Sequence, residues 1–469
     1  MSHHRVLALA DDLSGAAETA MALRLPSRIV LGAPARGLRA EDGSAALPTP
    51  GECVVVDLDS RQLPADRAAR SVQDALTAGA SPDGVLFKKV DSLLRGNLAA
   101  ETAAYAAGAR GVVIAPALPV AGRTVRGGVV HLRGVPLHTT DAWRAEGRPP
   151  PRSVSDALDG VPTALVPLSV VRGGALADQL RACFAQGQHP VCDAETDEDL
   201  NLIAGAAHEL GPDVRMLGTG GLAAALGRQL APVPETTPRP NGTAERPLLV
   251  VVGTAEPTAA EQIARLTAVG ARHVPLAAGE LTSSSTRRLD ITPNGITVVS
   301  LTGPVSPASS RELVTALASA VAGVAGDSDL VLTGGETARR VLDALRITQL
   351  RPVAQIHHGA VHSHAPDGRS VVTRPGSFGE ADSLSRIARA LRPEPPHPPP
   401  CTSYHPVFKE KPRERSSHRR HRRPDRRHPT CAPGHRGDHG RRRRYRTGGR
   451  GPGAAAPQHA PRLPSGGRR

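Results

Sequence analysis

Short apolar runs recur along the chain, and each is followed by a polar loop and then by a segment rich in alanine and leucine. An apolar run of this length, bounded by turn signals, is typical of a buried strand, and the segments that follow are typical of helices. Repeated alternation of this kind predicts an α/β fold with parallel, doubly wound sheets. The strands that we predict span residues 6–10, 53–56, 85–87, 111–115, 163–166, 214–217, 248–252 and 329–333.

The proline-rich residues 232–242 interrupt this pattern, and we interpret them as part of a linker between two α/β domains. The predicted organisation is a first domain over residues 1–231, a linker over 232–247, a second domain over 248–392 and a tail over 393–469.

The basic charge of the chain lies in the predicted tail. This segment has 20 lysines and arginines against 5 aspartates and glutamates, whereas the rest of the chain has 38 against 39. A segment so charged and so poor in apolar residues is predicted to be disordered. Nucleic-acid binding through phosphate contacts is one interpretation of the tail. We favour an extension without function, because a basic block without interleaved aromatic residues specifies no partner.

Composition narrows the class of protein further. No apolar run reaches the ~18 residues of a membrane span, and the N-terminus lacks the apolar core of a signal peptide, so we expect a cytoplasmic protein. Five cysteines without C-x-x-C spacing disfavour a disulfide framework and a zinc site. Four histidines, at positions 357, 358, 362 and 364, are interpreted as solvated residues of an irregular loop rather than as metal ligands.

Polar residues follow the predicted strands at their carboxyl ends, where an open α/β sheet binds its ligands. Two adjacent aspartates follow the first strand, Arg61 follows the second, and residues 88–97 contain two lysines, an aspartate and an arginine. Together with Arg123 in a later loop, these cations predict an anionic substrate. Two simpler alternatives stay open: the charges pair only with one another, or Asp12 or Ser14 merely caps the following helix.

The second domain has glycines at a comparable position. Gly334 and Gly335 follow the strand at 329–333 and precede a helix that we expect over residues 339–345. Paired glycines at a helix start let a phosphate approach backbone N–H groups, although tight packing also explains them. No Walker A motif follows, and residues 376–379 provide a second glycine-rich turn.

Taken in order, these motifs resemble those of the four-carbon acid sugar kinases, ATP-dependent enzymes that phosphorylate threonate, erythronate or 3-oxo-tetronate. The similarity covers about residues 5 to 391. It lies in residues 10–16, 60–61, 88–92, 94–97, 122–124, 253–254 with Gln262, and 333–338. The chain departs from the family pattern at Leu93, at Arg374-Pro375 and at residues 358–361.

The resemblance implies an N-terminal domain that binds the acid sugar, a C-terminal domain that binds ATP, and a cleft between them. It implies substrate contacts from Asp12, Arg61, Lys89, Val90, Asp91, Ser92, Arg95 and Arg123. It implies nucleotide contacts from Thr254, Gly334, Gly335, Glu336, Thr337 and Gly376.

For such a kinase we expect Arg61 and Lys89 to hold the substrate carboxylate, and Asp12 or Asp91 to accept the proton of the attacking hydroxyl. The sequence does not choose between the two aspartates. Mg²⁺ would bridge the phosphates of ATP. Glu336 would bind this Mg²⁺ through water or cap its helix, and both roles stay open.

Two other classes of function compete with the kinase. A phosphatase or mutase would use an aspartate after the first strand as a covalent nucleophile, but it would leave the glycine-rich second domain unexplained. A nucleic-acid-binding protein would act through the basic tail, but it would leave the polar strand ends unexplained.

Overall fold

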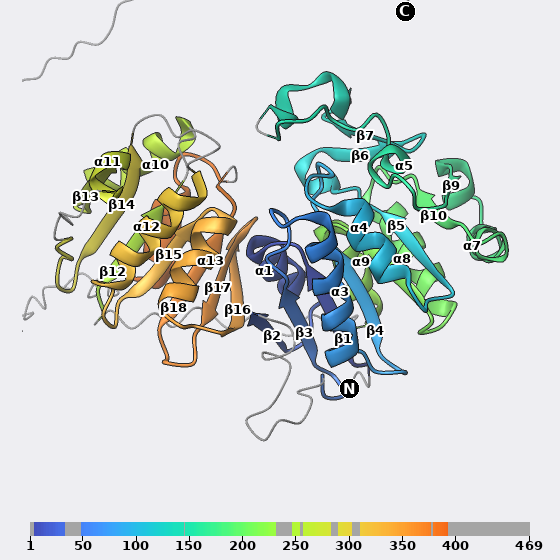
Figure 1. Ribbon diagram of the computed structural model, residues 1–469, viewed down its shortest axis with the longest axis horizontal. Helices are drawn as coiled ribbons and strands as arrows, with labels where there is room; N and C mark the ends of the chain where they lie inside the picture. The colour runs from blue at the N-terminus through green and yellow to red at the C-terminus, as the bar shows by residue number, and fades with distance from the viewer. Residues whose placement is uncertain are drawn as a thin grey trace, which may run out of the picture. The chain divides into compact units, whose positions relative to one another are not determined.

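Figure 1 shows a computed structural model of the chain, which describes residues 4–32, 48–144, 146–230, 246–253, 257–282, 289–302, 310–376 and 379–392. The predicted tail, all but the last two residues of the predicted linker, and Thr254 lie outside these ranges. No helix in the described part of the chain is long and apolar enough to cross a membrane.

The N-terminal half forms a sheet in which all neighbouring strands are parallel, in the order β2-β3-β1-β4-β11-β5-β10-β9. The strands are β1 (Val6–Ala10), β2 (Ser27–Leu31), β3 (Cys53–Asp57), β4 (Val85–Lys89), β5 (Gly111–Ala115), β9 (Thr163–Val166), β10 (His189–Cys192) and β11 (Val214–Gly218).

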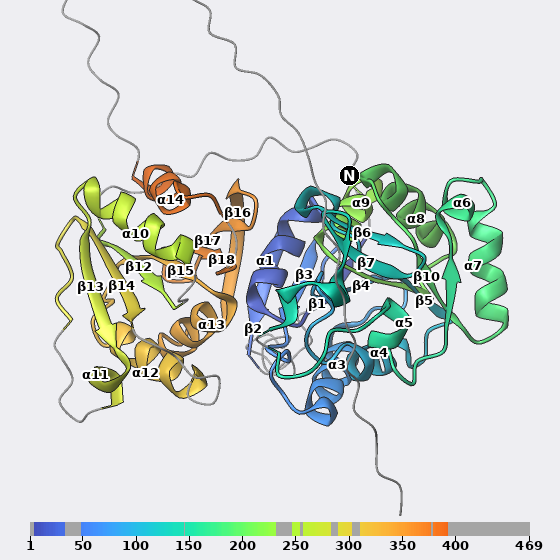
Figure 2. The same cartoon turned by 90° about the horizontal axis from the view of Figure 1, so that it is seen from above.

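Helices cover both faces of this sheet (Figure 2), with α1, α8 and α9 on one face and α3 and α4 on the other. Strands that are buried on both faces consist of unbroken apolar runs, and such runs predict β1, β3 and β5 from the sequence. The helices are α1 (Leu13–Ala22), α3 (Ala65–Gly79), α4 (Leu98–Ala106), α5 (Val154–Ala157), α6 (Leu168–Val171), α7 (Leu176–Ala185), α8 (Asp197–Glu209) and α9 (Gly220–Leu230).

A small antiparallel sheet is inserted after β5. It contains β6 (Arg123–Arg126), β7 (Val129–Leu132) and β8 (Val135–Pro136). Trp143 follows this sheet, and its buried indole Nε1 donates a hydrogen bond of 2.7 Å to the carbonyl oxygen of Leu93. The insertion therefore holds the loop after β4 from outside the main sheet.

The C-terminal half continues the same sheet, because Gln349 and Leu350 of β16 pair antiparallel with Val30 and Ile29 of β2. Its strands follow the order β13-β14-β12-β15-β18-β17-β16, of which the first five are parallel. Helices α10 and α14 pack together on one face, and α11, α12 and α13 on the other (Figure 2). The elements are β12 (Leu248–Val252), α10 (Pro257–Ala268), β13 (Arg272–Ala277), α11 (Ala278–Thr282), β14 (Ile296–Thr302), α12 (Ser310–Ala322), β15 (Asp329–Thr333), α13 (Gly335–Ala344), β16 (Gln349–His357), β17 (Ala360–His364), β18 (Ser370–Arg374) and α14 (Ser383–Leu391).

The predicted α/β fold class is confirmed, with strands of both halves joined in one large, mainly parallel sheet, and two local predictions are wrong. Helix α13 begins at Gly335 and not near residue 339, because Gly334 takes a positive φ of 96° and serves as its N-cap. The segment with four histidines is not an irregular loop: β16 and β17 form an antiparallel hairpin that extends the sheet. These strands mix polar and apolar residues, so they lack the apolar runs from which the other strands are predicted.

One of these histidines, His362, is fully buried in β17, in register with Val372. Neither nitrogen of its ring has a hydrogen-bond partner among the described residues. Burial lowers the pKa of this imidazole to about 4, and the neighbouring His364 adds to the effect. The folded protein therefore holds His362 in its neutral form at neutral pH.

We expect His362 to make the protein less stable as pH falls. An unfolded histidine titrates near 6.5, so between about pH 6.5 and 4 the unfolded chain binds more protons than the folded one. This effect leaves the free energy of unfolding unchanged above pH 6.5 and lowers it by ~3 kcal/mol by about pH 4. Urea unfolding of the parent chain and of His362→Leu at pH 7 and pH 4.5 measures it. The parent should lose more stability than the variant, and equal losses would contradict the assignment.

Candidate active site

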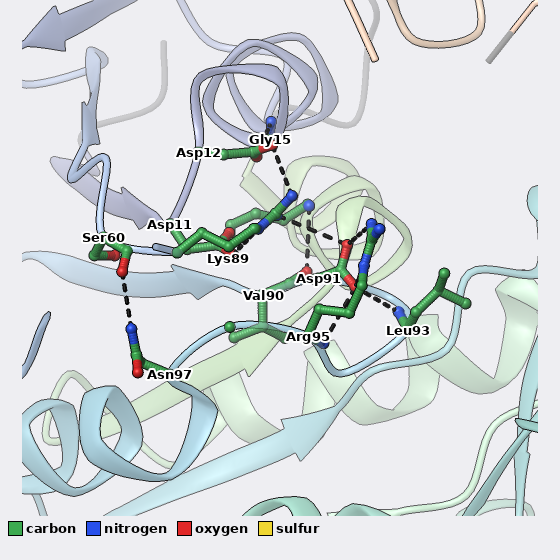
Figure 3. Close-up of polar contacts among 12 residues, drawn as sticks. Asp11, Asp12, Gly15, Ser60, Lys89, Val90, Asp91, Leu93, Arg95 and Asn97 are labelled. Carbon is green, nitrogen blue, oxygen red and sulfur yellow. Dashed lines mark hydrogen bonds and ion pairs between the residues drawn. The ribbon is translucent and has the colours of Figure 1, made fainter. Parts of the chain in front are cut away.

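Three loops from neighbouring strands meet at one edge of the N-terminal sheet. Ala10 at the end of β1 pairs in register with Asp57 of β3 and with Lys89 of β4. The loops that follow these three strands therefore begin at the same level. They carry the aspartate pair and the segment 90–97, of which Figure 3 labels several residues, and also Arg61.

Asp12 is the N-cap of α1. Its Oδ1 accepts a hydrogen bond of 2.8 Å from the backbone N–H of Gly15, so the capping role considered from the sequence is present. Its second oxygen, Oδ2, lies 2.9 Å from Nη1 of Arg61. One carboxylate thus begins the helix and also faces a cation in the neighbouring loop.

Arg61 contacts three carboxylates. Its Nε lies 2.8 Å from Oδ2 of Asp11, its Nη1 contacts Asp12, and its Nη2 lies 3.7 Å from Oδ1 of Asp91. All three aspartates follow strand ends, and a guanidinium is suited to such a site because its donors are fixed in one plane. Arg61 is therefore the charge that allows the three carboxylates to lie close together.

The two adjacent aspartates differ in acidity. Burial raises the pKa of Asp12 above its ordinary value, with Arg61 opposing this effect and the charge of Asp11 adding to it. Burial also acts on Asp11, but Arg61 and the two lysines outweigh it and hold the pKa of Asp11 below its ordinary value. Divergent pKa values in a pair of carboxyl groups are typical of sites where one group handles a proton.

Asp91 is bound on all sides. Its Oδ2 accepts hydrogen bonds from the N–H of Leu93 at 3.0 Å and from Nε of Arg95 at 2.8 Å, and its Oδ1 accepts one from Nη2 of Arg95 at 2.8 Å (Figure 3). Burial alone would raise the pKa of Asp91, but these bonds and the charge of Arg61 hold it well below its usual range. Asp91 is therefore an ionised anchor of its loop.

The two lysines at the end of β4 point to opposite faces of the sheet, as neighbouring residues in a strand must. Nζ of Lys89 lies 3.3 Å from Oε2 of Glu18 on α1, whereas Nζ of Lys88 lies 2.6 Å from Oε2 of Glu101 on α4. Lys88 is fully buried, so the expectation that both lysines face an anionic ligand is wrong for Lys88.

The other predicted substrate residues lie around this centre. Val90 is buried, and its N–H donates to the carbonyl oxygen of Gly218 on β11 at 2.9 Å. Ser92 is buried and accepts a hydrogen bond from the guanidinium of Arg123, which reaches it from β6. Burial lowers the pKa of Arg123.

The N-terminus of α13 approaches this centre from the C-terminal half. An ideal Cβ built on Gly335 would lie 2.9 Å from Oδ2 of Asp12 and 3.2 Å from Oγ of Ser14, so only glycine allows this distance. No side chain caps α13, and its first-turn N–H groups lie at the positive end of the helix dipole. This end of the helix is suited to an anion.

A cavity joins the two halves at this point. Of the residues predicted as site residues, it is lined by Asp12, Arg61, Arg95, Gly335 and Glu336. It is also lined by six residues that the sequence analysis did not assign to the site: Asp11, Leu13, Asp59, Gln62, Glu146 and Arg340.

Two ion pairs fix α13 to the N-terminal half beside this cavity. Nη2 of Arg340 lies 2.7 Å from Oδ2 of Asp59, and Nη1 of Arg339 lies 2.7 Å from Oδ2 of Asp57. Burial raises the pKa of Asp57 to about 7, although Arg339 opposes this effect. These partners are about 280 residues apart in the chain, so no local pattern indicates them.

Not all predicted nucleotide residues line the cavity. Thr337 is buried, and an ideal Cβ on Gly253 would lie only 1.9 Å from its hydroxyl, so Thr337 packs against the end of β12. Gly376 follows β18 and is not part of the cavity lining. Thr254 lies outside the described residues. The described residues contain no group of three or more His, Cys, Asp or Glu side chains that could hold a metal ion.

The fold and the site define a two-domain protein with a polar centre in one half and, from the other, a helix N-terminus that has no side-chain cap. Residues 6–226 match the family described as a sugar-binding N-terminal domain, and residues 249–384 match that of a nucleotide-binding C-terminal domain.

Named relatives identify the family. The D-threonate kinase of Cupriavidus necator is 32% identical over 416 residues, which are 82% of this chain and 97% of the relative. The D-erythronate kinase of Heliobacterium modesticaldum is 31% identical over 52% of this chain and 56% of the relative. The chain therefore belongs to the family of four-carbon acid sugar kinases, which confirms the predicted resemblance.

A solved structure has the same fold. The crystal structure of a Salmonella typhimurium protein described as a putative tRNA synthase covers 83% of this chain and 99% of its own, with a TM-score of 0.66 and 22% identity. At this identity the likeness concerns the fold alone. Membership of the kinase family disfavours the phosphatase and nucleic-acid-binding alternatives.

Proposed function

We propose that this chain is an ATP-dependent kinase that phosphorylates a hydroxyl of D-threonate. The observation that carries the proposal is the distance of the N-terminus of α13 from Asp12, with Gly335 close enough to Asp12 that a side chain would collide with it. Phosphoryl transfer needs a hydroxyl, a proton acceptor and a phosphate-binding group in one place. D-threonate comes first among four-carbon acid sugars because relatives that match over most of their length carry that name.

Asp12 is the proposed proton acceptor. Its carboxylate lines the cavity, and its raised pKa suits a group that takes a proton from a hydroxyl. Asp91 is a poorer acceptor because both of its oxygens receive hydrogen bonds from Arg95. Asp91 instead has the role of orienting Arg95.

The substrate carboxylate is assigned to Arg61 and Arg95, whose side chains line the cavity with exposed fractions of 20% and 30%. Each guanidinium carries five N–H donors, and its contacts with the aspartates use only some of them, so the others can bind a substrate carboxylate. Lys89 is only 5% exposed and is paired with Glu18, so its role is to add positive charge near the aspartates. Val90 and Ser92 hold the loop, with Arg123 bound to Ser92.

The nucleotide is assigned to the turn between β15 and α13. Gly334, with its positive φ, and Gly335 leave the backbone N–H groups of α13 accessible, which fits the phosphates of ATP. When bound, ATP supplies the phosphoryl group, and Mg²⁺ neutralises the charge of its phosphates. Glu336, which lines the cavity from the first turn of α13, would be the carboxylate that reaches a water of that Mg²⁺. Thr254, Thr337 and Gly376 remain predicted supports of the nucleotide site.

The test is ATP consumption by the purified full-length chain with Mg²⁺ and a panel of D- and L-threonate, D- and L-erythronate and 3-oxo-tetronate. We expect turnover that requires ATP, Mg²⁺ and one acid sugar, with D-threonate giving the highest kcat/KM. A different preferred acid sugar would retain the kinase and replace the substrate. No turnover with any acid sugar, together with no effect of ATP on the melting temperature, would overturn the proposal.

A further inference from the structure

Behind the active-site loops lies a buried polar network that the proposed reaction does not use. Lys88, Ser60 and Glu101 are exposed by 0%, 0% and 2% of their surfaces. Lys88 is the last residue but one of β4, Ser60 lies in the loop after β3, and Glu101 lies in the first turn of α4. Burial of two charges and a hydroxyl is costly unless each has a partner.

Each polar group of this network has a partner. One oxygen of Glu101 lies 2.6 Å from Nζ of Lys88, and the other accepts a hydrogen bond of 2.5 Å from the hydroxyl of Ser60. Lys88 also donates to the carbonyl oxygen of Lys89 at 3.1 Å. The network is therefore closed, and no oxygen of Glu101 is left for a ligand.

The network holds the loop that carries Arg61. Asn97, one helical turn before Glu101, donates from Nδ2 to the carbonyl oxygen of Ser60 at 2.9 Å (Figure 3) and to that of Leu63 at 2.8 Å. The N–H of Ser60 donates to the carbonyl oxygen of Asp11 at 3.1 Å. Three hydrogen bonds thus hold the loop beside Arg61: one between Ser60 and Glu101 of α4, and two from Asn97, the N-cap of α4.

We propose that Glu101, held by Lys88, is a positioning residue that acts through Ser60 to place the Arg61 guanidinium between Asp11, Asp12 and Asp91. The Arg61 side chain is one-fifth exposed, its stem runs along Gly96, and the printed ion pairs of its guanidinium are with the three aspartates. The backbone on both sides of Arg61 is held at Ser60 and Leu63. This inference rests on the proposed function, in which Arg61 binds the substrate carboxylate and faces the proton acceptor.

The critical variant is Ser60→Ala, which removes the hydroxyl and leaves the Lys88–Glu101 ion pair in place. We expect the KM for the acid sugar to rise about tenfold and the KM for ATP to stay within about twofold. The acid limb of the kcat/KM profile should move to higher pH, because Arg61 then lowers the pKa of Asp12 less. A purely structural role for Ser60 would lower the melting temperature and leave the pH profile in place.

Three further variants sharpen the test. Ser60→Thr keeps the hydroxyl, so the KM for the acid sugar and the acid limb of the kcat/KM profile should both be those of the parent. The double variant Lys88→Met with Glu101→Gln removes both buried charges and the contact that holds residue 101, so the KM for the acid sugar should rise as in Ser60→Ala. Thr102→Val changes a buried hydroxyl on the same helix that has no partner among the described residues, and it should alter neither parameter.

Crystal structures of the parent and of Ser60→Ala give a readout that does not depend on turnover. The inference expects the 2.9 Å contact between Arg61 and Asp12 to be lost in the variant. An intact contact, or an unchanged KM and pH profile in an active enzyme, would overturn it. If the parent turns over no acid sugar, the proposed function fails, while the displacement of Arg61 still decides the positioning role.

Discussion

Asp12→Asn is expected to lower kcat by about 10²- to 10⁴-fold, the range typical of a lost general base. Asparagine is also a good N-cap, so its side-chain oxygen can still accept from the N–H of Gly15 and keep α1 in place. The fold and the KM for ATP should therefore change little. Steady-state kinetics with saturating ATP, combined with thermal unfolding, separates the loss of chemistry from a loss of structure.

Asp91→Asn is the matched comparison, because it makes the same chemical change on the neighbouring loop. Here we expect the KM for the acid sugar to rise more than kcat falls, since Arg95 loses its ionised partner. The pH profile offers a second comparison: the acid limb of kcat/KM in the parent should follow a group with a pKa above the ordinary value for aspartate. If Asp91→Asn abolished kcat while Asp12→Asn kept most of it, the two roles would have to be exchanged.

The centre of the site was predictable because it is built from strand ends. Asp12, Arg61 and Asp91 each follow an apolar run, and the carboxyl ends of neighbouring parallel strands lie at the same level. Strand β1 lies between β3 and β4, and this order brings the three loops together. The sequence supplied the ends of these strands, and the family resemblance supplied the expectation that their loops share one site.

The orientation of the side chains was less predictable. Lys88 and Lys89 look alike in the sequence, but alternation along a strand sends one towards α4 and the other towards α1. Which of the two faces the site depends on the helix that covers each face. Their partners, Glu101 and Glu18, are single acidic residues in alanine-rich helices, and nothing local separates them from solvated charges.

Contacts between distant segments gave no local signal. Arg339 and Arg340 read as ordinary charged residues of an amphipathic helix, yet they pair with Asp57 and Asp59 in the other half of the site. The pair of Arg339 with Asp57 is buried, and breaking such a pair from one side typically costs about 3–5 kcal/mol. Such pairs help to hold α13 at the cavity. The sequence does not indicate them, so it does not predict the position of Gly335 relative to Asp12.

Gly335→Ala is expected to lower kcat by about 10²-fold, as is typical when reacting groups are displaced by about 1 Å. The new Cβ would lie 2.9 Å from Oδ2 of Asp12, which is too close, so either α13 moves away or Asp12 leaves Arg61. Alanine stabilises a helix relative to glycine by up to about 1 kcal/mol, which limits the loss of stability. Kinetics and thermal unfolding of the same preparation should therefore show a large loss of activity with a small change in melting temperature.

Gly323→Ala provides the control in the same half of the chain. Gly323 directly follows α12, and a Cβ there would meet nothing closer than 3.6 Å, an ordinary van der Waals distance. We expect this variant to keep the parent kcat. If Gly335→Ala also kept it, phosphoryl transfer would not depend on the close approach of α13 to Asp12, and the proton acceptor and the phosphate site would have to be sought farther apart. A loss of kcat in Gly335→Ala but not in Gly323→Ala would place the reacting groups between the N-terminus of α13 and Asp12.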